Sequence, residues 1–587
     1  MNGSLKERVV REILPRVQTP GQYIGGERNG VIKDRQAVRG TVCLAFPDVY
    51  TIGMSNHGLQ VLYRAMNSRA DWACERVFAP WPDMERELRE RGLPLYSLET
   101  FTPLDRFDVL GFTLQYDLSY TNVLTLLDLG GVPLRAEDRE LRHPLVIAGG
   151  PCVQNPEPMS PFIDLFVIGD GEESLPAVCD AWLAARAESS DRRAALAHLA
   201  RSLPYVYVPS CWSPEPQGAG ARMRPLDATI PDVIKPAVVA DLDGLPLPTE
   251  PIVPMIECVQ DRISIEIMRG CPWRCRFCQS TTIKRPLRFR QVETIVAAAL
   301  ESYRNTGYEE ISLLSLSTSD YPHFDELMRR MQETFRPLGV AISVPSLRIN
   351  EELRTVADLL NTDRHAGLTL APEVALDDMR RQIGKPIKND DLFEGCRKAF
   401  ENGFHRVKLY FMCGLPGERT ADLDGMIEMA ETIAAMGREI RGRAVTVVVN
   451  VSNFVPKPHT PYQWNAMQTR DYFRQAQRRL FQYRRMRNVE IKCHDIETSL
   501  LEGVMARGDR RVGAAIELAW RRGARLDSWR EHFQADLWWQ ALADAGIDVD
   551  AILHQPFGAD APLPWDHITI RQGRGYLEKE HQKSLLL

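Results

Sequence analysis

The chain has 587 residues, of which 44% are hydrophobic and 26% are charged, and its formal net charge is −6. These values are typical of a large globular protein with several domains, and they exclude a protein that coats nucleic acid over its whole surface. The sequence contains no apolar run of about eighteen residues that would predict a membrane span. The first ten residues lack a signal-peptide core, and the twelve scattered cysteines form no disulfide framework, so we expect a cytoplasmic protein with reduced thiols.

Residues 1–40 form a charged arm, and residues 41–200 then alternate short apolar strands with helices. This alternation predicts a doubly wound parallel α/β sheet. Such sheets bind ligands at the carboxyl ends of their strands, where Asp48, Gly149, Gly150 and the segment 169–172 stand. The strands are expected at 41–46, 107–114, 144–150 and 164–169.

Prolines recur through residues 201–260, which predicts an irregular connector with a short hairpin at 205–208. Strand–helix alternation resumes over 261–468, and residues 469–587 are expected to be mainly helical and then rich in loops. The six strands of the second alternating region are expected at 263–267, 311–316, 340–344, 367–371, 407–411 and 445–450.

Three cysteines follow the first of these six strands. Cys271, Cys275 and Cys278 have the spacing C-x3-C-x2-C, so three thiolates can hold three corners of a cubane iron–sulfur cluster and leave the fourth iron open. A zinc site normally takes a fourth protein ligand, and no other Cys or His lies between Cys258 and His323. The alternatives are a cysteine loop without metal and a zinc site completed from a distant segment.

A strand that leads into C-x3-C-x2-C, with Phe277 before the last cysteine, resembles the radical S-adenosylmethionine (radical SAM) superfamily. The resemblance implies a partial (β/α)6 barrel, a partial version of the TIM barrel, over residues 261–468. It also implies a [4Fe-4S] cluster on the three cysteines, whose open iron binds S-adenosylmethionine (SAM). One electron from a flavodoxin- or ferredoxin-like donor would then release a 5′-deoxyadenosyl radical that abstracts hydrogen from a substrate.

The resemblance extends to strand ends of the barrel. Ser317 and Ser319 stand after the second strand, where superfamily members carry a Gly-Gly-Glu-like turn, so they are expected as replacements in contact with SAM. Glu373 ends the fourth strand, and Gly414 and Gly417 follow the fifth in a Gly-Leu-Pro-Gly-Glu turn that lets the backbone approach adenosine. Phe277 is also expected to position SAM. An ordinary turn or a capped helix is the alternative at each position.

A doubly wound domain before such a barrel resembles the cobalamin-binding radical SAM group. The segments 48–58, 149–151, 155–158, 169–172 and 507–511 resemble a bacterial family of that group with an N-terminal Rossmann-like domain. The resemblance implies cobalamin-dependent methyl transfer to an unactivated carbon. The Asp-x-His-x-x-Gly fingerprint of methionine-synthase-like domains is absent, because Ser55 precedes and Gly58 directly follows His57. A sheet that only caps the barrel is therefore the alternative.

Two other functions remain open from the sequence, which does not identify the substrate. The layout also resembles methylthiotransferases, which insert sulfur with a second cluster; Cys43, Cys74 and Cys152 are available for one, although Cys43 within a strand is more typical of a buried structural cysteine. RNA is one substrate for this reaction. The other function is a non-catalytic iron–sulfur or metal module.

An arginine-rich stretch, 474–487, also bears on RNA as a partner. It forms either a basic RNA groove or the solvated side of an amphipathic helix, because Phe473, Ala476, Leu480 and Tyr483 recur at helical spacing.

Overall fold

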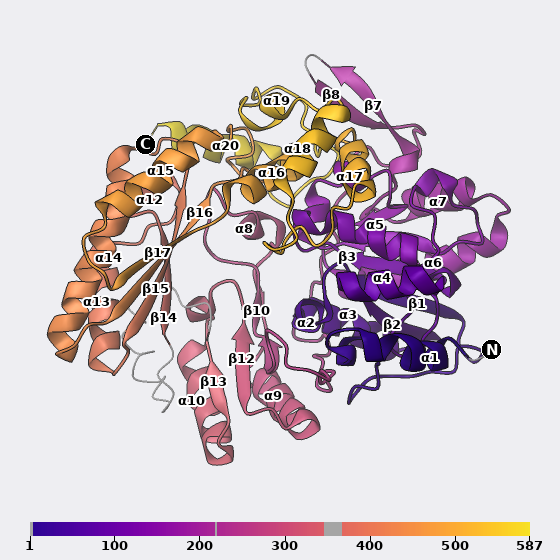
Figure 1. Cartoon of the computed structure of the whole chain (residues 1–587), viewed down its shortest axis with the longest axis horizontal. Helices are drawn as coiled ribbons and strands as arrows, with labels where there is room; N and C mark the ends of the chain where they lie inside the picture. Colours follow the sequence, from indigo (N-terminus) through magenta and orange to yellow (C-terminus); the bar gives the residue numbers. More distant parts are fainter. Residues whose placement is uncertain (1–3, 218–219, 345–366, 587) are drawn as a thin grey trace.

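The computed structural model describes residues 4–217, 220–344 and 367–586. Its N-terminal part is a six-stranded sheet of order β2-β1-β3-β4-β5-β6, in which β1 to β5 run parallel and β6 is antiparallel to β5 (Figure 1). The strands are β1 (Gly40–Phe46), β2 (Trp72–Phe78), β3 (Val109–Thr113), β4 (Leu145–Gly149), β5 (Leu165–Val167) and β6 (Val206–Tyr207). The expected doubly wound parallel sheet is confirmed.

Strand β2 was absent from the sequence prediction because two charged residues interrupt its apolar run. Glu75 and Arg76 are nonetheless buried, and Arg76 lies 2.6 Å from Glu99 and 3.2 Å from Glu27. Ser97 and Thr100 donate hydrogen bonds to Glu75. A buried charge is tolerated only when it is paired in this way, and the partners come from outside the strand.

Helices cover both faces of this sheet. Helix α3 packs against α6, and α4 packs against α5. The chain crosses from β1 to β2 in one direction and from β2 to β3 in the other, so the following helices lie on opposite faces and leave a crevice at the carboxyl ends of β1 and β3. The helices of this part are α1 (Leu5–Arg8), α2 (Tyr50–Gly53), α3 (His57–Asn67), α4 (Pro82–Arg91), α5 (Tyr120–Leu129), α6 (Gly171–Glu188) and α7 (Arg192–Ser202).

The second α/β part, which was expected to be the partial barrel and is called the barrel below, contains two parallel sheets, of orders β13-β12-β9 and β14-β15-β16-β17. All six expected strands are present: β9 (Ile263–Glu266), β12 (Glu310–Leu314), β13 (Ala341–Ser343), β14 (Leu368–Glu373), β15 (Arg406–Cys413) and β16 (Thr446–Asn453). A seventh strand, β17 (Val489–Cys493), pairs parallel with β16 and extends the sheet into the stretch expected to be mainly helical. Its described helices are α8 (Ser280–Ile283), α9 (Val292–Thr306), α10 (Phe324–Phe335), α12 (Asp377–Gln382), α13 (Asn389–Glu401), α14 (Thr420–Arg441) and α15 (Arg470–Tyr483).

The proline-rich connector differs from the prediction. Residues 205–208 do not form a hairpin, because β6 pairs with β5 of the N-terminal sheet. The hairpin is instead β7 (Trp212–Gln217) with β8 (Gly220–Pro225). The backbone of 206–207 finds its hydrogen-bond partners at a sheet edge, which the local sequence does not show.

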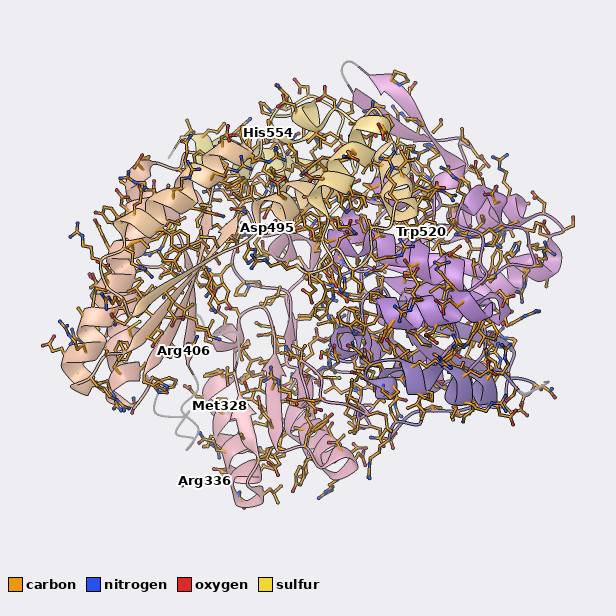
Figure 2. The ribbon with its side chains drawn as sticks, viewed as in Figure 1. Met328, Arg336, Arg406, Asp495, Trp520 and His554 are labelled. Atoms are coloured by element: carbon orange, nitrogen blue, oxygen red, sulfur yellow. The ribbon has the colours of Figure 1, made fainter. Side chains whose placement is uncertain are left out.

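The C-terminal helices lie across the top of the molecule in Figure 1, between the N-terminal domain and the β14–β17 sheet. They are α16 (Ile496–Arg507), α17 (Val512–Arg521), α18 (Ala535–Asp544), α19 (Val549–Leu553) and α20 (Arg574–Leu585). Trp520, at the edge of this layer in Figure 2, donates a 3.0 Å hydrogen bond to Thr125 of the N-terminal domain. Among the described residues, no helix has the length and apolarity needed to cross a membrane.

Candidate active site

The cysteine loop leaves the barrel between two short antiparallel strands, β10 (Met268–Arg269) and β11 (Arg288–Phe289). Gly270 starts the loop with φ = 92°, and a Cβ there would lie 2.9 Å from the carbonyl oxygen of Lys284, so this position requires glycine. Arg285 donates hydrogen bonds to the carbonyl groups of Cys271 and Trp273, both at 3.0 Å. The guanidinium therefore fixes the backbone between the first two cysteines.

A second arginine fixes the other side of the loop. The backbone N–H of Arg276 donates to Ile383, and its guanidinium donates to Gln382 at 2.6 Å. The same guanidinium lies 3.1 Å from Glu580 of α20, so the C-terminal helix holds it as well. The loop that carries Cys275 and Cys278 is thus attached to the segment that follows α12.

Cys271 and Cys275 are buried, and Cys278 is partly buried. Burial raises the pKa of the Cys278 thiol, and the nearby Cys271 and Glu373 raise it further. No group of three His, Cys, Asp or Glu side chains converges as one metal ion would require, within the residues that the structure describes. The loop supplies three thiolates, which is the donor set of a cubane cluster with one iron left open.

Strand β14 ends at Glu373 and brings its carboxylate near Cys278. Glu373 has a left-handed φ of 66°, and the register of β14 against β15 shifts just before it. Lys385 donates to its Oε1 at 2.8 Å. A non-glycine residue at positive φ is strained, and such strain concentrates at functional sites. Phe277 packs beside it, against a small apolar cluster composed of Val374, Met379, Ile383, Leu415, Phe454 and Tyr462.

Gly414 and Gly417 stand in the turn after β15 with φ = 86° and 79°. A Cβ on Gly414 would lie 2.7 Å from Phe473, and one on Gly417 would lie 2.7 Å from Gln382. Gln382 donates to the carbonyl group of Pro416 and accepts from Arg276, so it joins this turn to the cysteine loop.

Ser317 lies after β12, and its hydroxyl group donates to Asp320 at 2.5 Å. The indole N–H of Trp273, in the cysteine loop, donates to the same carboxylate oxygen at 2.6 Å. Ser319 is buried in the same turn. The serine turn is therefore attached to the cysteine loop through Asp320, which the sequence prediction missed although it stands in the same segment.

A cavity of ≈ 390 Å³ lies between the two α/β parts. Seven glycines form much of its wall, so main chain and apolar side chains line most of its surface. Gly149, Gly150 and the segment 169–172 line it as expected, whereas Asp48 does not and instead accepts from Trp529 at 2.9 Å. The glycines are Gly58, Gly111, Gly149, Gly150, Gly169, Gly171 and Gly270.

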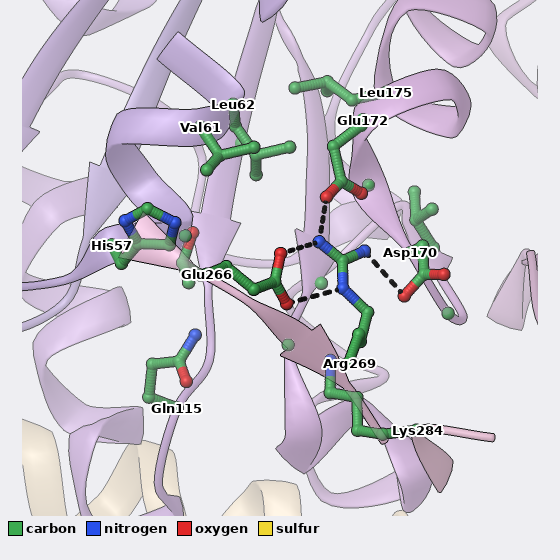
Figure 3. Close-up of a pocket in the computed structure, with 18 of the residues that line it drawn as sticks. His57, Val61, Leu62, Gln115, Asp170, Glu172, Leu175, Glu266, Arg269 and Lys284 are labelled. Atoms are coloured by element: carbon green, nitrogen blue, oxygen red, sulfur yellow. Dashed lines mark hydrogen bonds and ion pairs between the residues drawn. The ribbon is translucent and has the colours of Figure 1, made fainter. Parts of the chain in front are cut away.

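Arg269 crosses this cavity from the barrel side (Figure 3). It pairs with Glu172, with Glu266 at 2.7 Å and with Asp170 at 3.2 Å, and Asp170 also pairs with Arg288 at 2.5 Å. Two of the three acids on Arg269 come from the N-terminal domain. This ion-pair cluster therefore holds the two domains together one residue before Gly270 and the cysteine loop.

The C-terminal region also connects the N-terminal domain and the barrel. Asn155 donates to the carbonyl groups of Ala506 and Gly508, and Lys457, after β16, lies 2.6 Å from Asp117 and 2.8 Å from Glu502. Arg507 donates only to backbone carbonyl groups, including that of Asn465 at 2.7 Å. The segment 507–511 thus fastens the C-terminal helices, and its arginine at 507 faces protein rather than a ligand.

The three cysteines available for a second cluster do not lie together. Cys43 and Cys74 are buried in the adjacent strands β1 and β2. The charged neighbours of Cys152 are Asp117, Lys457 and Glu502, at the carboxyl edge of the sheet.

Residues 474–483 of the arginine-rich stretch lie in helix α15, as the amphipathic alternative predicts, whereas residues 484–487 follow the helix. Phe473, Ala476 and Leu480 are buried. Arg479 pairs with Asp424 at 2.6 Å, and Arg474 lies 3.7 Å from Asp471. Its basic side is thus partly neutralised by neighbouring acids.

Two family models match the chain. Residues 58–209 match the N-terminal region of radical SAM proteins, and residues 265–430 match the radical SAM superfamily. The chain therefore contains a radical SAM domain, preceded by the N-terminal region found in radical SAM proteins. The cysteine loop and its surrounding strand ends all lie within or beside the second match.

The chain is similar in sequence to two kinds of curated protein and in fold to a solved methyltransferase. The uncharacterized protein MJ0966 of Methanocaldococcus jannaschii is 24% identical over 477 residues, which cover 79% of this chain and 92% of that protein. The ribosomal protein uS12 methylthiotransferase RimO of Microcystis aeruginosa is 25% identical over 178 residues, 28% of this chain and 40% of RimO. The solved radical SAM methyltransferase TsrM from Kitasatospora setae, with cobalamin and a [4Fe-4S] cluster bound, covers 70% of this chain and 74% of its own, at 16% identity and a TM-score of 0.46.

Proposed function

We propose that this radical SAM enzyme uses cobalamin to transfer a methyl group to an unactivated carbon of its substrate. The observation that carries the proposal is the cavity at the crevice between β1 and β3, because its far wall is formed by the strand that leads into the cysteine loop. Apolar side chains and glycine backbone suit the broad face of a corrin ring. Thr113 and Gln115 at the end of β3 and Ser315 after β12 also line the cavity, and their polar side chains suit the amide groups of the ring.

Cys271, Cys275 and Cys278 would hold the cluster as thiolates, and Glu373, Gly414, Gly417 and the serine turn would position SAM. When bound, the cluster and SAM supply a 5′-deoxyadenosyl radical and cobalamin supplies the methyl group, with an electron donor of the flavodoxin or ferredoxin type as reductant. Because burial raises the pKa of Cys278, iron must displace a proton there.

The remaining residues hold this arrangement and keep water out. Arg276, Arg285 and Gln382 fix the loop by hydrogen bonds to main-chain carbonyl groups. The buried cluster around Phe277 shields one side, and the C-terminal helices cover the junction. A carbon radical reacts with accessible solvent and stray hydrogen donors, so such a cover is a requirement of the chemistry.

The test is cobalamin retention by anaerobically reconstituted protein, measured by visible absorption after gel filtration. Val61→Trp places a large side chain in the cavity and is expected to lower retention at least tenfold while iron and sulfide contents stay unchanged. The matched control is Val259→Trp, since Val259 is 69% exposed outside the cavity. Wild-type protein that retains no cobalamin would refute the methyl-transfer proposal.

Sulfur insertion is the second candidate, and the sequence similarity to RimO favours it, although the name of RimO supports a ribosomal-protein substrate rather than RNA. That reaction needs a second cluster, whereas Cys43 and Cys74 lie in mid-strand and Cys152 has separate neighbours. Iron and sulfide counting separates the two functions, because methyl transfer requires one cluster and sulfur insertion requires two.

A further inference from the structure

His57 is the first residue of α3 and lines the cavity. Its Nε2 atom is buried and has no hydrogen-bond partner among the described residues. Leaving a buried polar atom without a partner costs about 1–3 kcal/mol, so an unpartnered ring nitrogen in a cavity calls for a ligand or water. Figure 3 shows its ring beside Glu266, at the side of the cavity opposite Lys284.

The imidazole ring is suited to bind a metal at this position. Burial lowers the pKa of His57, which keeps the ring neutral and one nitrogen free to donate its lone pair. Glu266 is the acid with the largest electrostatic effect on the ring, and Arg269 holds both of its carboxylate oxygens. A fixed carboxylate near a histidine strengthens the ring as a metal ligand.

The other possible donor to a transition metal in the described lining is the thioether of Met268, which is a softer and weaker donor than imidazole. The residues around the cavity in the described chain include no cysteine and no second histidine, and the carboxylates of Asp170, Glu172 and Glu266 are occupied by arginines. Imidazole nitrogen is a common ligand for first-row transition metals. The absence of the Asp-x-His-x-x-Gly spacing therefore does not remove histidine from this site, because the fold brings one there.

We propose that Nε2 of His57 would be a protein ligand to the cobalt of a corrinoid held in this cavity. The inference rests on the proposed function, since it needs a corrinoid in the cavity. It assigns to this chain a protein ligand that the missing Asp-x-His-x-x-Gly fingerprint does not identify. Such a ligand would set the electron density on the metal and hence its readiness to give up a methyl group.

Electron paramagnetic resonance of the full-length protein loaded with cob(II)inamide tests the assignment. This corrinoid lacks the nucleotide base, so an axial nitrogen can come only from the protein or from added ligands. Wild-type protein is expected to show three-line nitrogen splitting of the cobalt resonances, which changes to two lines after labelling with ¹⁵N-histidine. His57→Ala is expected to lose the splitting.

The matched control is His459→Asn, because the Nε2 atom of His459 is also buried and unpartnered but lies outside this cavity. Asparagine suits the left-handed φ of 57° at that position, and the nitrogen splitting should persist. If His57→Ala does not fold, the isotope experiment on wild-type protein still tests for a histidine ligand, and His57 is the one histidine in the described lining of the cavity.

The outcomes separate the two proposals. Retained cob(II)inamide without nitrogen splitting, as expected for a histidine that bonds only to water, would overturn the ligand assignment and leave the proposed function intact. Protein that retains neither cobalamin nor cob(II)inamide would overturn both.

Discussion

The two parallel α/β parts present their strand ends in different ways. At the edge of the N-terminal sheet, glycines and apolar side chains leave an open cavity. At the barrel edge, arginine and glutamine side chains fasten the cysteine loop and the turns around it. The same rule places both sites at carboxyl ends, but one edge suits a broad flat ligand and the other a small group held at fixed points.

The ion-pair cluster around Arg269 is where the two edges meet. Its carboxylates come from β9 and from the start of α6, and its backbone leads into Gly270. A change at this point therefore affects both edges. Substitutions confined to one edge should affect only that edge, and the following experiments compare the two.

The largest expected effect is the loss of the cluster in Cys275→Ala. Without a third thiolate the iron and sulfide contents should fall to background, and 5′-deoxyadenosine formation from SAM should fall at least a thousandfold. Cys152→Ala is the matched control at the edge of the N-terminal sheet, and it should retain full iron content. Iron loss in that control would indicate a second cluster, and no 5′-deoxyadenosine from wild-type protein would favour a non-catalytic module.

Arg269→Met should destabilise the folded protein by about 3–5 kcal/mol, because it leaves carboxylates of both domains buried without their cation. The measurement is urea unfolding at neutral pH. Arg262→Met is the control, since the pair with Glu310 is partly exposed and should contribute at most about 1 kcal/mol. Equal effects from both variants would show that the cluster does not hold the domains together.

The burial of Glu418 at the barrel edge predicts that the stability of the folded protein depends on pH. Burial raises the pKa of Glu418 to about 7, although Tyr472 and the N–H of Gly414 donate to it. The folded state therefore binds this proton more tightly than the unfolded chain, and stability falls as the pH rises from about 4.5 to 7. Relative to wild type, Glu418→Gln should gain up to about 3 kcal/mol between pH 5 and pH 8 in denaturant unfolding. A pH-independent difference would contradict the assignment.

Gly169→Ala tests the edge of the N-terminal sheet, and it should lower the free energy of unfolding by about 2 kcal/mol or more. Gly169 has φ = 108°, and a Cβ there would lie 2.2 Å from the carbonyl oxygen of Ala237. The control Gly26→Ala has a positive φ but no neighbour within 4 Å, so its cost in thermal unfolding should be the smaller one. The iron content of both variants should remain that of wild type.

Much of the fold follows from local pattern. Apolar runs such as β1 and the alternation in β9 identify strands because parallel strands are buried on one or both faces. Strand β2 was missed because Glu75 and Arg76 are buried only through partners far away in sequence. Strand β17 was missed because it is short and lies between two helices.

Some features of the candidate site could also be predicted from the sequence, and others depend on the tertiary structure. The spacing of Cys271, Cys275 and Cys278 is a local property, so the sequence alone predicts a cluster loop and its superfamily. The contacts of Asp320, Gln382 and Arg269 are long-range, and they depend on which strand ends meet. His57 was discounted on its spacing, but the cavity that α3 shares with Glu266 and Arg269 decides what its ring faces.

The sequence by itself determined the cysteine loop, the two alternating α/β regions and the glycine turns, because each depends on residues a few positions apart. Only the tertiary structure decided that two strand edges enclose one cavity, that Arg269 joins them and that an unpartnered imidazole nitrogen is buried in its wall. The physical reason is that burial and charge pairing are properties of neighbours in space, and these neighbours come from segments that lie far apart along the chain.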